Sequence, residues 1–339
     1  MTKTNYLKKS KFLIFSIKQN FSGLIFSGSI IFIMALIISN PSLFSSSTIK
    51  GLKLFFYSVL PGLLPFMFLT KLLTELGTIF KITKKLSPVS QKLFGTPGVS
   101  LYCFFMSILS GYPIGAKIIS DLYSKKLINE EDAKRMSIFC TTSGPIFVIG
   151  AIGAGMLGNL KLGVIIYISH ILSSLLFGII YNIIFKSKNK ENQEQIYIEH
   201  TQKTNIISLC LSETINSLFL VAGYITIFYL ASEVLENLKV FNFLTSLIVP
   251  IFSKIQSSQI KAFLFGILEV TRGAKELSKF GSSCAPIICG LVSFSGISII
   301  MQSLSFLKTA KIKAHSFIFS KCVLGILSIL ICNILIFMC

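Results

Sequence analysis

Two charged residues interrupt an apolar run in the second half of the sequence. Glu269 directly follows residues 263–268, and Arg272 comes three residues later. An acidic side chain in such a run is costly inside a membrane, so it marks a candidate site for a solute or for a coupling ion, H⁺ or Na⁺. Arg272 could bind a carboxylate through two parallel hydrogen bonds. The structural alternatives are that Glu269 pairs with Arg272 on one helix face, and that Arg272 anchors to lipid headgroups.

Hydroxyl side chains lie beside glycine and proline at three further points, 110–117, 141–145 and 282–286. Clustered glycine and proline prevent a regular helix, so these points predict broken helices or helix starts. The hydroxyl groups could hydrogen-bond a polar solute, or they could cap helix ends and connect neighbouring helices. The candidate solute-binding residues are Ser110, Gly111, Tyr112, Pro113, Gly115, Thr141, Thr142, Ser143, Gly144, Pro145, Glu269, Thr271, Arg272, Gly273, Ser283 and Pro286.

Broken helices have a direct consequence for binding. An interrupted helix leaves backbone N–H and C=O groups unpaired at membrane depth, which is tolerated only where protein or a water-filled cavity satisfies them. The freed N-terminal ends carry partial positive charge and favour an anionic group. Lys117 and Lys275 follow two of the breaks and could extend to the membrane surface instead of contacting the solute.

The composition indicates the elements that carry these residues. Of 339 residues, 53% are hydrophobic and only 13% are charged, with a mean hydropathy of +0.77. A soluble fold cannot cover so much apolar surface with so few charges. At about 20 residues per span, we expect an all-α polytopic integral membrane protein of roughly eight to ten helical segments.

The charge distribution favours a lipid bilayer over nucleic acid as the partner. The formal charge is +19, and the lysines lie between apolar runs, as expected of loops on the cytoplasmic side of a membrane. The eight cysteines form no CxxC pair and the three histidines are scattered, so neither a disulfide framework nor a metal site is expected. No P-loop, HExxH or GxSxG motif occurs, so the sequence does not indicate an enzyme, and no cofactor is expected.

The apolar runs and polar breaks divide the chain into four parts. Residues 1–50 form a basic cytoplasmic tail and a first span, and 186–205 form a polar linker. The linker separates two halves, 51–185 and 206–339. Pro61 and Pro65 predict a kinked or broken helix at the start of the first half. Asn129, followed by three acidic residues, predicts a helix N-cap.

The two halves share motifs in the same order. Residues 115–117 and 273–275 both read Gly-Ala-Lys, and 142–146 aligns with 283–287 through hydroxyl-bearing residues and Pro-Ile. Duplicated halves with helices interrupted at corresponding positions indicate a transporter binding site. We therefore expect the breaks at 110–117 and 269–275 to share one cavity. Whether residues 99–119 span the membrane or re-enter it stays open at this point.

Four segments then carry a resemblance to a known family. Residues 60–66 (LPGLLPF), 110–117 (SGYPIGAK), 142–145 (TSGP) and 268–273 (LEVTRG) resemble the sporulation integral membrane protein YlbJ family, also called stage V sporulation protein VV. That family lies in the nucleoside recognition or Gate group, which is related to concentrative nucleoside transporters. The resemblance covers roughly residues 50–335.

The resemblance implies a function and a location. It implies transport of a small anionic solute, dipicolinic acid, across the outer forespore membrane of an endospore-forming bacterium. A nucleoside-type or other small-solute permease and a non-transporting structural or assembly protein of sporulation are the alternatives. Homo-oligomers or other sporulation membrane proteins are the expected protein partners.

Overall fold

The computed structural model describes residues 27–28, 30–186, 205–252 and 255–338. Every regular element in these ranges is a helix, which confirms the predicted all-α class. Within them, four helices are long and apolar enough to cross a membrane, or six if each of two bent helix pairs counts as one span. Most of the predicted basic tail and of the polar linker lies outside the described residues.

The first apolar region bends instead of continuing straight. The helix Ile30–Ser39 meets α2 (Pro41–Leu54) at a bend of 105° at Asn40, where proline begins the new helix. The chain then passes through a short π-helix, η1 (Phe55–Val59), into α3 (Leu60–Leu76). Pro61 lies in the first turn of α3 and Pro65 inside it, so the predicted disturbance takes the form of a π-helical segment just before the two prolines.

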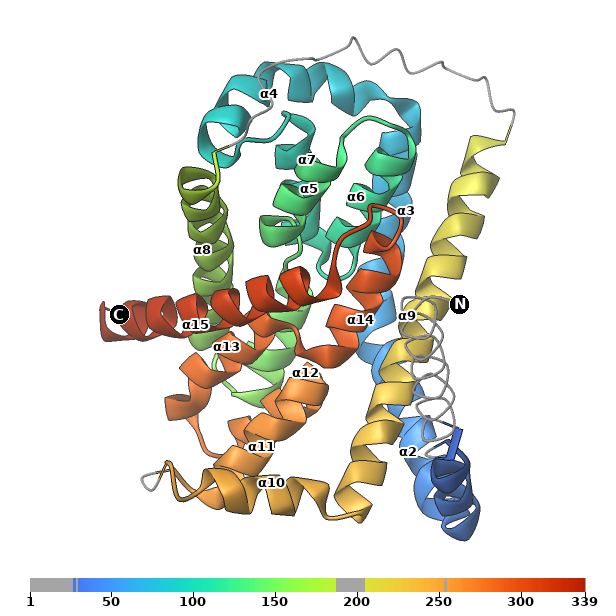
Figure 1. Ribbon diagram of the computed structural model, residues 1–339, viewed down its shortest axis with the longest axis vertical. Coiled ribbons are helices and arrows are strands. Elements are labelled where there is room, and N and C mark those ends of the chain that lie inside the picture. The colour runs from blue at the N-terminus through green and yellow to red at the C-terminus, as the bar shows by residue number, and fades with distance from the viewer. Residues whose placement is uncertain (1–26, 29, 187–204, 253–254, 339) are drawn as a thin grey trace, which may run out of the picture.

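The first half contains a helical hairpin and a broken helix. After α3, α4 (Thr78–Phe94) lies across one end of the molecule (Figure 1). Next come α5 (Val99–Ser110) and α6 (Ile114–Ser124), which pack against each other, so residues 99–119 turn back instead of crossing as one span. The half ends with α7 (Glu130–Phe139), the π-helix η2 (Ile146–Met156) and α8 (Leu160–Ile184).

The second half repeats this order. It begins with α9 (Ile206–Asn237), and α10 (Val240–Ile248) lies across the opposite end of the molecule from α4 (Figure 1). The hairpin α11 (Ser257–Leu268) and α12 (Val270–Ser278) follows, then a short 3₁₀ turn, η3 (Ser282–Cys284). The half ends with α13 (Ala285–Phe294), α14 (Gly296–Leu307) and α15 (Ala314–Met338). Helices of one type at opposite ends are what inverted halves would produce.

Residues 282–286 form a helix start, one of the two predicted possibilities, and the second break of the second half lies elsewhere. Residues 283–287 do not interrupt a helix, because Ser283 lies in η3 and Pro286 occupies the first turn of α13. Proline is compatible with that position, since its missing N–H is unpaired there in any helix. The interruption falls between α13 and α14 at Ser295 and Gly296, with φ of 81° and 67°. The structural counterpart of residues 140–145 is therefore the Ser295 region.

Local signals fix where several helices begin. Asn129 caps α7 as predicted, since its side chain accepts a hydrogen bond from Asp132 N at 2.8 Å, and the Asp132 carboxylate accepts one from Asn129 N. Such a capping box satisfies two of the N–H groups that a helix start leaves unpaired. Asn159 caps α8 through a single hydrogen bond, which its side chain accepts from Leu162 N at 3.1 Å.

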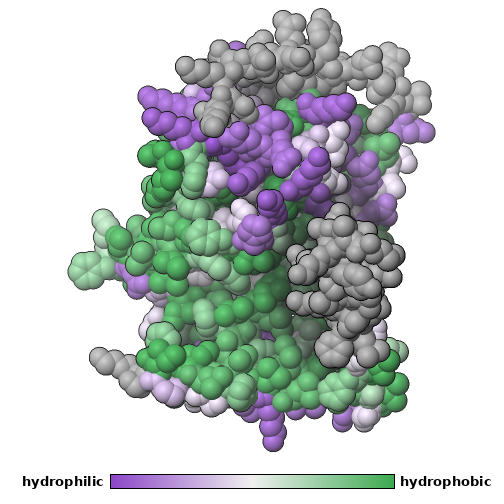
Figure 2. All heavy atoms as spheres, viewed as in Figure 1, coloured by the Kyte–Doolittle hydropathy of each residue, from purple (hydrophilic) through white to green (hydrophobic). Residues whose placement is uncertain are grey.

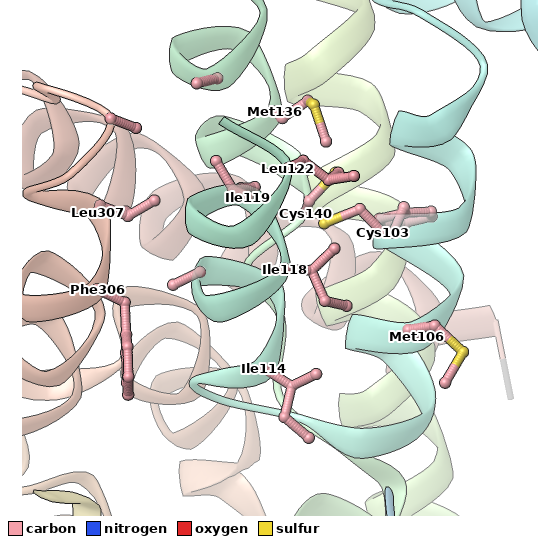
Figure 3. Packing of buried hydrophobic residues seen from close by; sticks show 14 of the residues in the cluster. Cys103, Met106, Ile114, Ile118, Ile119, Leu122, Met136, Cys140, Phe306 and Leu307 are labelled. Carbon is pink, nitrogen blue, oxygen red and sulfur yellow. The ribbon is translucent and has the colours of Figure 1, made fainter. Parts of the chain in front are cut away.

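Apolar packing holds the first hairpin in the interior. Figure 3 shows α6 with its side chains between those of α5, α7 and α14, and the buried residues include Ile118, Ile119 and Leu122. Outside, apolar residues cover the middle of the face shown in Figure 2, and hydrophilic residues gather near the end where α4 lies. Near that end Lys71 of α3 pairs with Asp121 of α6 at 3.1 Å and with Glu213 of α9 at 2.7 Å. Glu213 thus joins α9 to α3.

Candidate functional site

One cavity lies where the broken helices of both halves meet. The centre of a water molecule can occupy about 80 Å³ within it, and the cavity is partly open to the surroundings. The α5–α6 break (Ser110 to Tyr112) and the α11–α12 break (Glu269 to Thr271) both line it. The prediction that these two motifs share a cavity is therefore confirmed. Residues of α3, α9, η2 and α14 complete the wall.

In the first half, two breaks pack backbone against backbone. Gly111 has a φ of 86°, and the peptide bond between Tyr112 and Pro113 is cis. A Cβ atom on Gly111 would lie 2.6 Å from the backbone nitrogen of Gly144. Only glycine allows this approach together with the left-handed backbone conformation. The hairpin turn and the α7–η2 break thereby form one rigid element at the cavity.

The second half has the same arrangement with different residues. A Cβ atom on Gly296, at the α13–α14 break, would lie 3.2 Å from Val270 N and 3.1 Å from Gly266 O of the hairpin. Glu269 connects α11 and α12 in an extended conformation, with φ of −141° and ψ of 113°. In both halves, therefore, the hairpin turn contacts the broken helix of its own half.

Glu269 caps the helix that follows it. Its carboxylate accepts hydrogen bonds from Thr271 N at 3.1 Å and Arg272 N at 2.7 Å, and only 3% of the residue is exposed. The negative carboxylate thus occupies the positive end of α12, where charge and dipole attract. This N-terminal end is consequently not open to an anionic solute while Glu269 stays in place.

Arg272 does not form the expected salt bridge with Glu269. Its guanidinium pairs with Glu233 of α9 at 3.0 Å, hydrogen-bonds Ser232 and lies 4.0 Å from the centre of the Phe265 ring. The physical reason is that Glu269 turns both carboxylate oxygens toward the α12 backbone. Arg272 also lies outside the cavity lining, so it connects α12 to α9.

A buried histidine connects the two halves. His170 of α8 accepts a hydrogen bond from Ser143 N at 2.8 Å through Nε2, and its Nδ1 lies 2.8 Å from Ser293 Oγ. Ser143 belongs to the α7–η2 break and Ser293 to the end of α13. His170 is therefore packed and hydrogen-bonded, and it joins the α7–η2 break to the end of α13.

Lys321 of α15 is a residue that the sequence reasoning missed. It is fully buried, and its ammonium group donates a hydrogen bond to Thr141 O at 2.6 Å. The same Nζ lies 3.4 Å from the Tyr112 hydroxyl. A signal existed in the sequence, because Lys321 is the only lysine, arginine or acidic residue within 314–338.

The predicted site residues separate into two groups. Those that line the cavity are Ser110, Gly111, Tyr112, Ser143, Gly144, Glu269 and Thr271. Those outside the lining are Pro113, Gly115, Thr141, Thr142, Pro145, Arg272, Gly273, Ser283 and Pro286. Several of the second group support the breaks. Thr142, for example, donates to Ser107 Oγ from both its N–H and its hydroxyl.

Polar groups in the cavity remain available to a ligand. Ser110 is 8% exposed and lines the cavity, and among the residues that the structure describes its buried hydroxyl has no hydrogen-bond partner. Gln302 and Ser298 of α14 also line the cavity, where the Gln302 amide donates to Ser298 Oγ at 3.3 Å, and sequence reasoning missed both. Gln302 was detectable as a lone amide within an apolar span, whereas Ser298 carries no distinguishing signal. A buried polar group without a partner is costly, so Ser110 favours a polar guest.

Comparisons with known proteins find a matching family model and a similar protein. Residues 56–186 match the Gate family model, described as nucleoside recognition. The chain is 25% identical over 327 residues to the sporulation integral membrane protein YlbJ of Bacillus subtilis (strain 168), covering 89% of this chain and 80% of the relative. The expected resemblance is confirmed. No solved structure matches the chain.

Proposed function

We propose that this protein is a membrane transporter that binds a small polar solute in the cavity between its two halves. The observation that carries the proposal is the shared cavity, lined by the α5–α6 break and the α11–α12 break together. Non-helical backbone inside a membrane domain is expected where it lines such a cavity. The absence of catalytic motifs from the sequence accords with transport in place of catalysis.

The proposed solute is dipicolinate, a small aromatic dianion, moved during sporulation. Support comes from the similarity to a sporulation membrane protein and from the unpartnered Ser110 hydroxyl. The Lys321 ammonium lies 3.4 Å from the hydroxyl of Tyr112, which lines the cavity, and so places a positive charge near the cavity wall. The proposed location is the outer forespore membrane, where a carrier of this class would pass dipicolinate toward the spore.

A nucleoside is the second candidate, and one observation favours it. Of the described residues that line the cavity, Glu269 is the only one with a charged side chain. A carboxylate and the Gln302 amide suit the hydroxyl and base groups of an uncharged nucleoside better than a dianion. Dipicolinate binding would require Glu269 to be protonated or to act as the site of a coupling cation.

Uptake by proteoliposomes tests the proposal and separates the candidates. The purified full chain is reconstituted and supplied with labelled dipicolinate or labelled uridine, with protein-free vesicles as the control. Saturable uptake of dipicolinate that unlabelled dipicolinate blocks and uridine does not would support the leading proposal. Saturable uptake of uridine alone would replace it with the nucleoside candidate. No uptake of either, from a folded protein that still restores sporulation to a deletion strain, would favour a structural or assembly role.

A further inference from the structure

Lys321 occupies a position in the fold that an ordinary lysine does not take. Lysine is almost never fully buried unless it is paired, yet Lys321 has no exposed surface. In the part of the chain that the structure describes, no carboxylate forms an ion pair with it. Its charge is balanced by other means.

A helix end and two aromatic ring faces stabilise the charge of the Lys321 ammonium group. Thr141, whose carbonyl accepts from Lys321 at 2.6 Å, lies two residues after Phe139, the last residue of α7. The C-terminal end of a helix carries partial negative charge, so a cation there is stabilised. The ammonium also lies 4.8 Å from the centre of the Tyr112 ring and 5.4 Å from that of Phe317, where ring faces attract cations.

The contacts join elements that are far apart in the sequence. Thr141 belongs to the break after α7, Tyr112 to the turn of the α5–α6 hairpin, and Lys321 to the last helix of the second half. Carbonyl oxygen, hydroxyl oxygen and ring faces are the groups that bind a monovalent cation or an ammonium ion. Here the ammonium group of Lys321, which is covalently part of the chain, lies among these groups.

We propose that Lys321 is a tethered cation, whose ammonium group fills a cation site built from the end of α7 and the α5–α6 turn. The fixed charge holds Tyr112 and the α7–η2 break in the arrangement that binds the solute. A carrier with such a lysine needs no dissociable cation at this point. Lys321 is therefore a positioning residue, which acts on the solute through Tyr112 and the break.

Chemical rescue tests this site directly. Lys321→Ala removes the three side-chain carbons and the nitrogen that n-propylammonium contains, so that amine is the probe. 1-Propanol, which has a similar size and no charge, is the matched control ligand. Lys275→Ala is the matched control variant, since Lys275 is exposed on α12. Thermal unfolding in detergent and proteoliposome uptake are both measured, and only the uptake measurement depends on the proposed function.

The expected results are specific to charge and size. Lys321→Ala should unfold at a lower temperature than the wild type. Its uptake should fall by roughly tenfold or more, because buried carbonyl and hydroxyl groups lose their partner. n-Propylammonium should raise the unfolding temperature of Lys321→Ala with a saturable dependence, and it should leave the wild type and Lys275→Ala unchanged. 1-Propanol should have no such effect.

Other results would overturn the proposal. Equal rescue by 1-propanol would show that volume, not charge, is what the site requires. Full stability and uptake in Lys321→Met, which keeps the volume without the charge, would show the same. If Lys321→Ala yields no folded protein, expression with n-propylammonium decides: recovered folded protein supports the tethered cation, and continued failure with Lys321→Met folding normally contradicts it. Rescue of stability without any solute uptake would support the cation site and count against transport.

Discussion

The two halves hold their broken helices with charges of opposite sign. In the second half, Glu269 belongs to the break itself and places a carboxylate on the N-terminal end of α12. In the first half, Lys321 comes from the other half and places an ammonium group beside the C-terminal end of α7. Each charge matches the dipole of the helix end that it contacts.

This difference shows how two halves with the same order of elements can depend on each other unequally. The α11–α12 turn is capped by a residue within its own hairpin. The α7–η2 break relies on Lys321 of α15, and on His170 for the hydrogen bond to Ser143 N. A substitution in α15 should therefore disturb the first half, whereas substitutions of Glu269 should mainly disturb the α11–α12 turn.

The largest effect should come from filling the closest glycine contact of the first half. A Cβ atom on Gly115 would lie 1.7 Å from Cys140 O. Gly115→Ala must separate α6 from the α7 break, which we expect to destabilise the protein by about 3 kcal/mol, the upper range for an overpacked core. Gly273→Ala in the second half, with a Cβ 2.1 Å from the Gly266 Cα atom, should cost nearly as much. Thermal unfolding of each variant measures the effect.

The control for both is a glycine with free space. Gly223 lies exposed on α9, and nothing would lie within 4 Å of an added Cβ atom. Gly223→Ala should be neutral or slightly stabilising, since alanine is the better helix former. Equal stability of Gly115→Ala and Gly223→Ala would mean that the α6–α7 contact is looser than the structure shows.

Removing the Glu269 cap should have the next largest effect. Glu269→Ala leaves two buried N–H groups unpaired, and we expect a loss of about 2 kcal/mol of stability. Glu269→Gln retains an acceptor oxygen and should keep the fold with a smaller loss. If Glu269 carries a coupling proton, Glu269→Gln should also abolish the pH dependence of uptake. Identical uptake and pH profiles for this variant and the wild type would make Glu269 a bystander in transport.

A smaller effect should follow from separating Arg272 from α9. The pair with Glu233 is partly exposed, with 14% and 17% of the two side chains accessible. Partial exposure weakens an ion pair, so Arg272→Ala should cost about 1–2 kcal/mol. A double-mutant cycle should show coupling of Arg272 with Glu233, and less with Glu269. Stronger coupling of Arg272 with Glu269 than with Glu233 would instead indicate the Glu269–Arg272 salt bridge that the sequence suggested.

The smallest effect should occur at Ser283. It is exposed in η3 and lies outside the cavity lining, so Ser283→Ala should change stability by less than about 0.5 kcal/mol. Ser110→Ala, by contrast, removes the unpaired cavity hydroxyl and should change the KM of uptake. If Ser283→Ala changed the KM of uptake and Ser110→Ala did not, the solute would bind near η3 and not in the cavity, which would contradict this account.

Sequence reasoning located the breaks that carry proline or an acidic residue. Residues 110–113, 141–145 and Glu269 all combine a helix-breaking or costly residue with apolar flanks, so their physics is local. The break at Ser295 has neither proline nor charge, and only its left-handed backbone reveals it. No sequence pattern distinguishes this break from the other serine and glycine residues within apolar spans.

Partners that are distant in the sequence could not be predicted. Arg272 binds Glu233 across 39 positions and Lys321 binds Thr141 across 180, and no periodicity connects either pair. The nearest apparent partner of Arg272 was Glu269, which the backbone of α12 takes instead. Both carboxylate oxygens of Glu269 accept hydrogen bonds from the α12 backbone, and the Arg272 guanidinium pairs with Glu233 instead.

Blocking the cavity tests the central claim most directly, namely that this cavity binds the transported solute. Gly62 lines the cavity, and its added Cβ would lie 3.5 Å from Ile146, which also lines it. Gly62→Phe should therefore fill the cavity, and Gly223→Phe adds the same bulk on the exposed side of α9. Proteoliposome uptake of the solute identified with the wild type should be lost in Gly62→Phe and retained in Gly223→Phe. Wild-type uptake in a folded Gly62→Phe protein would contradict the account.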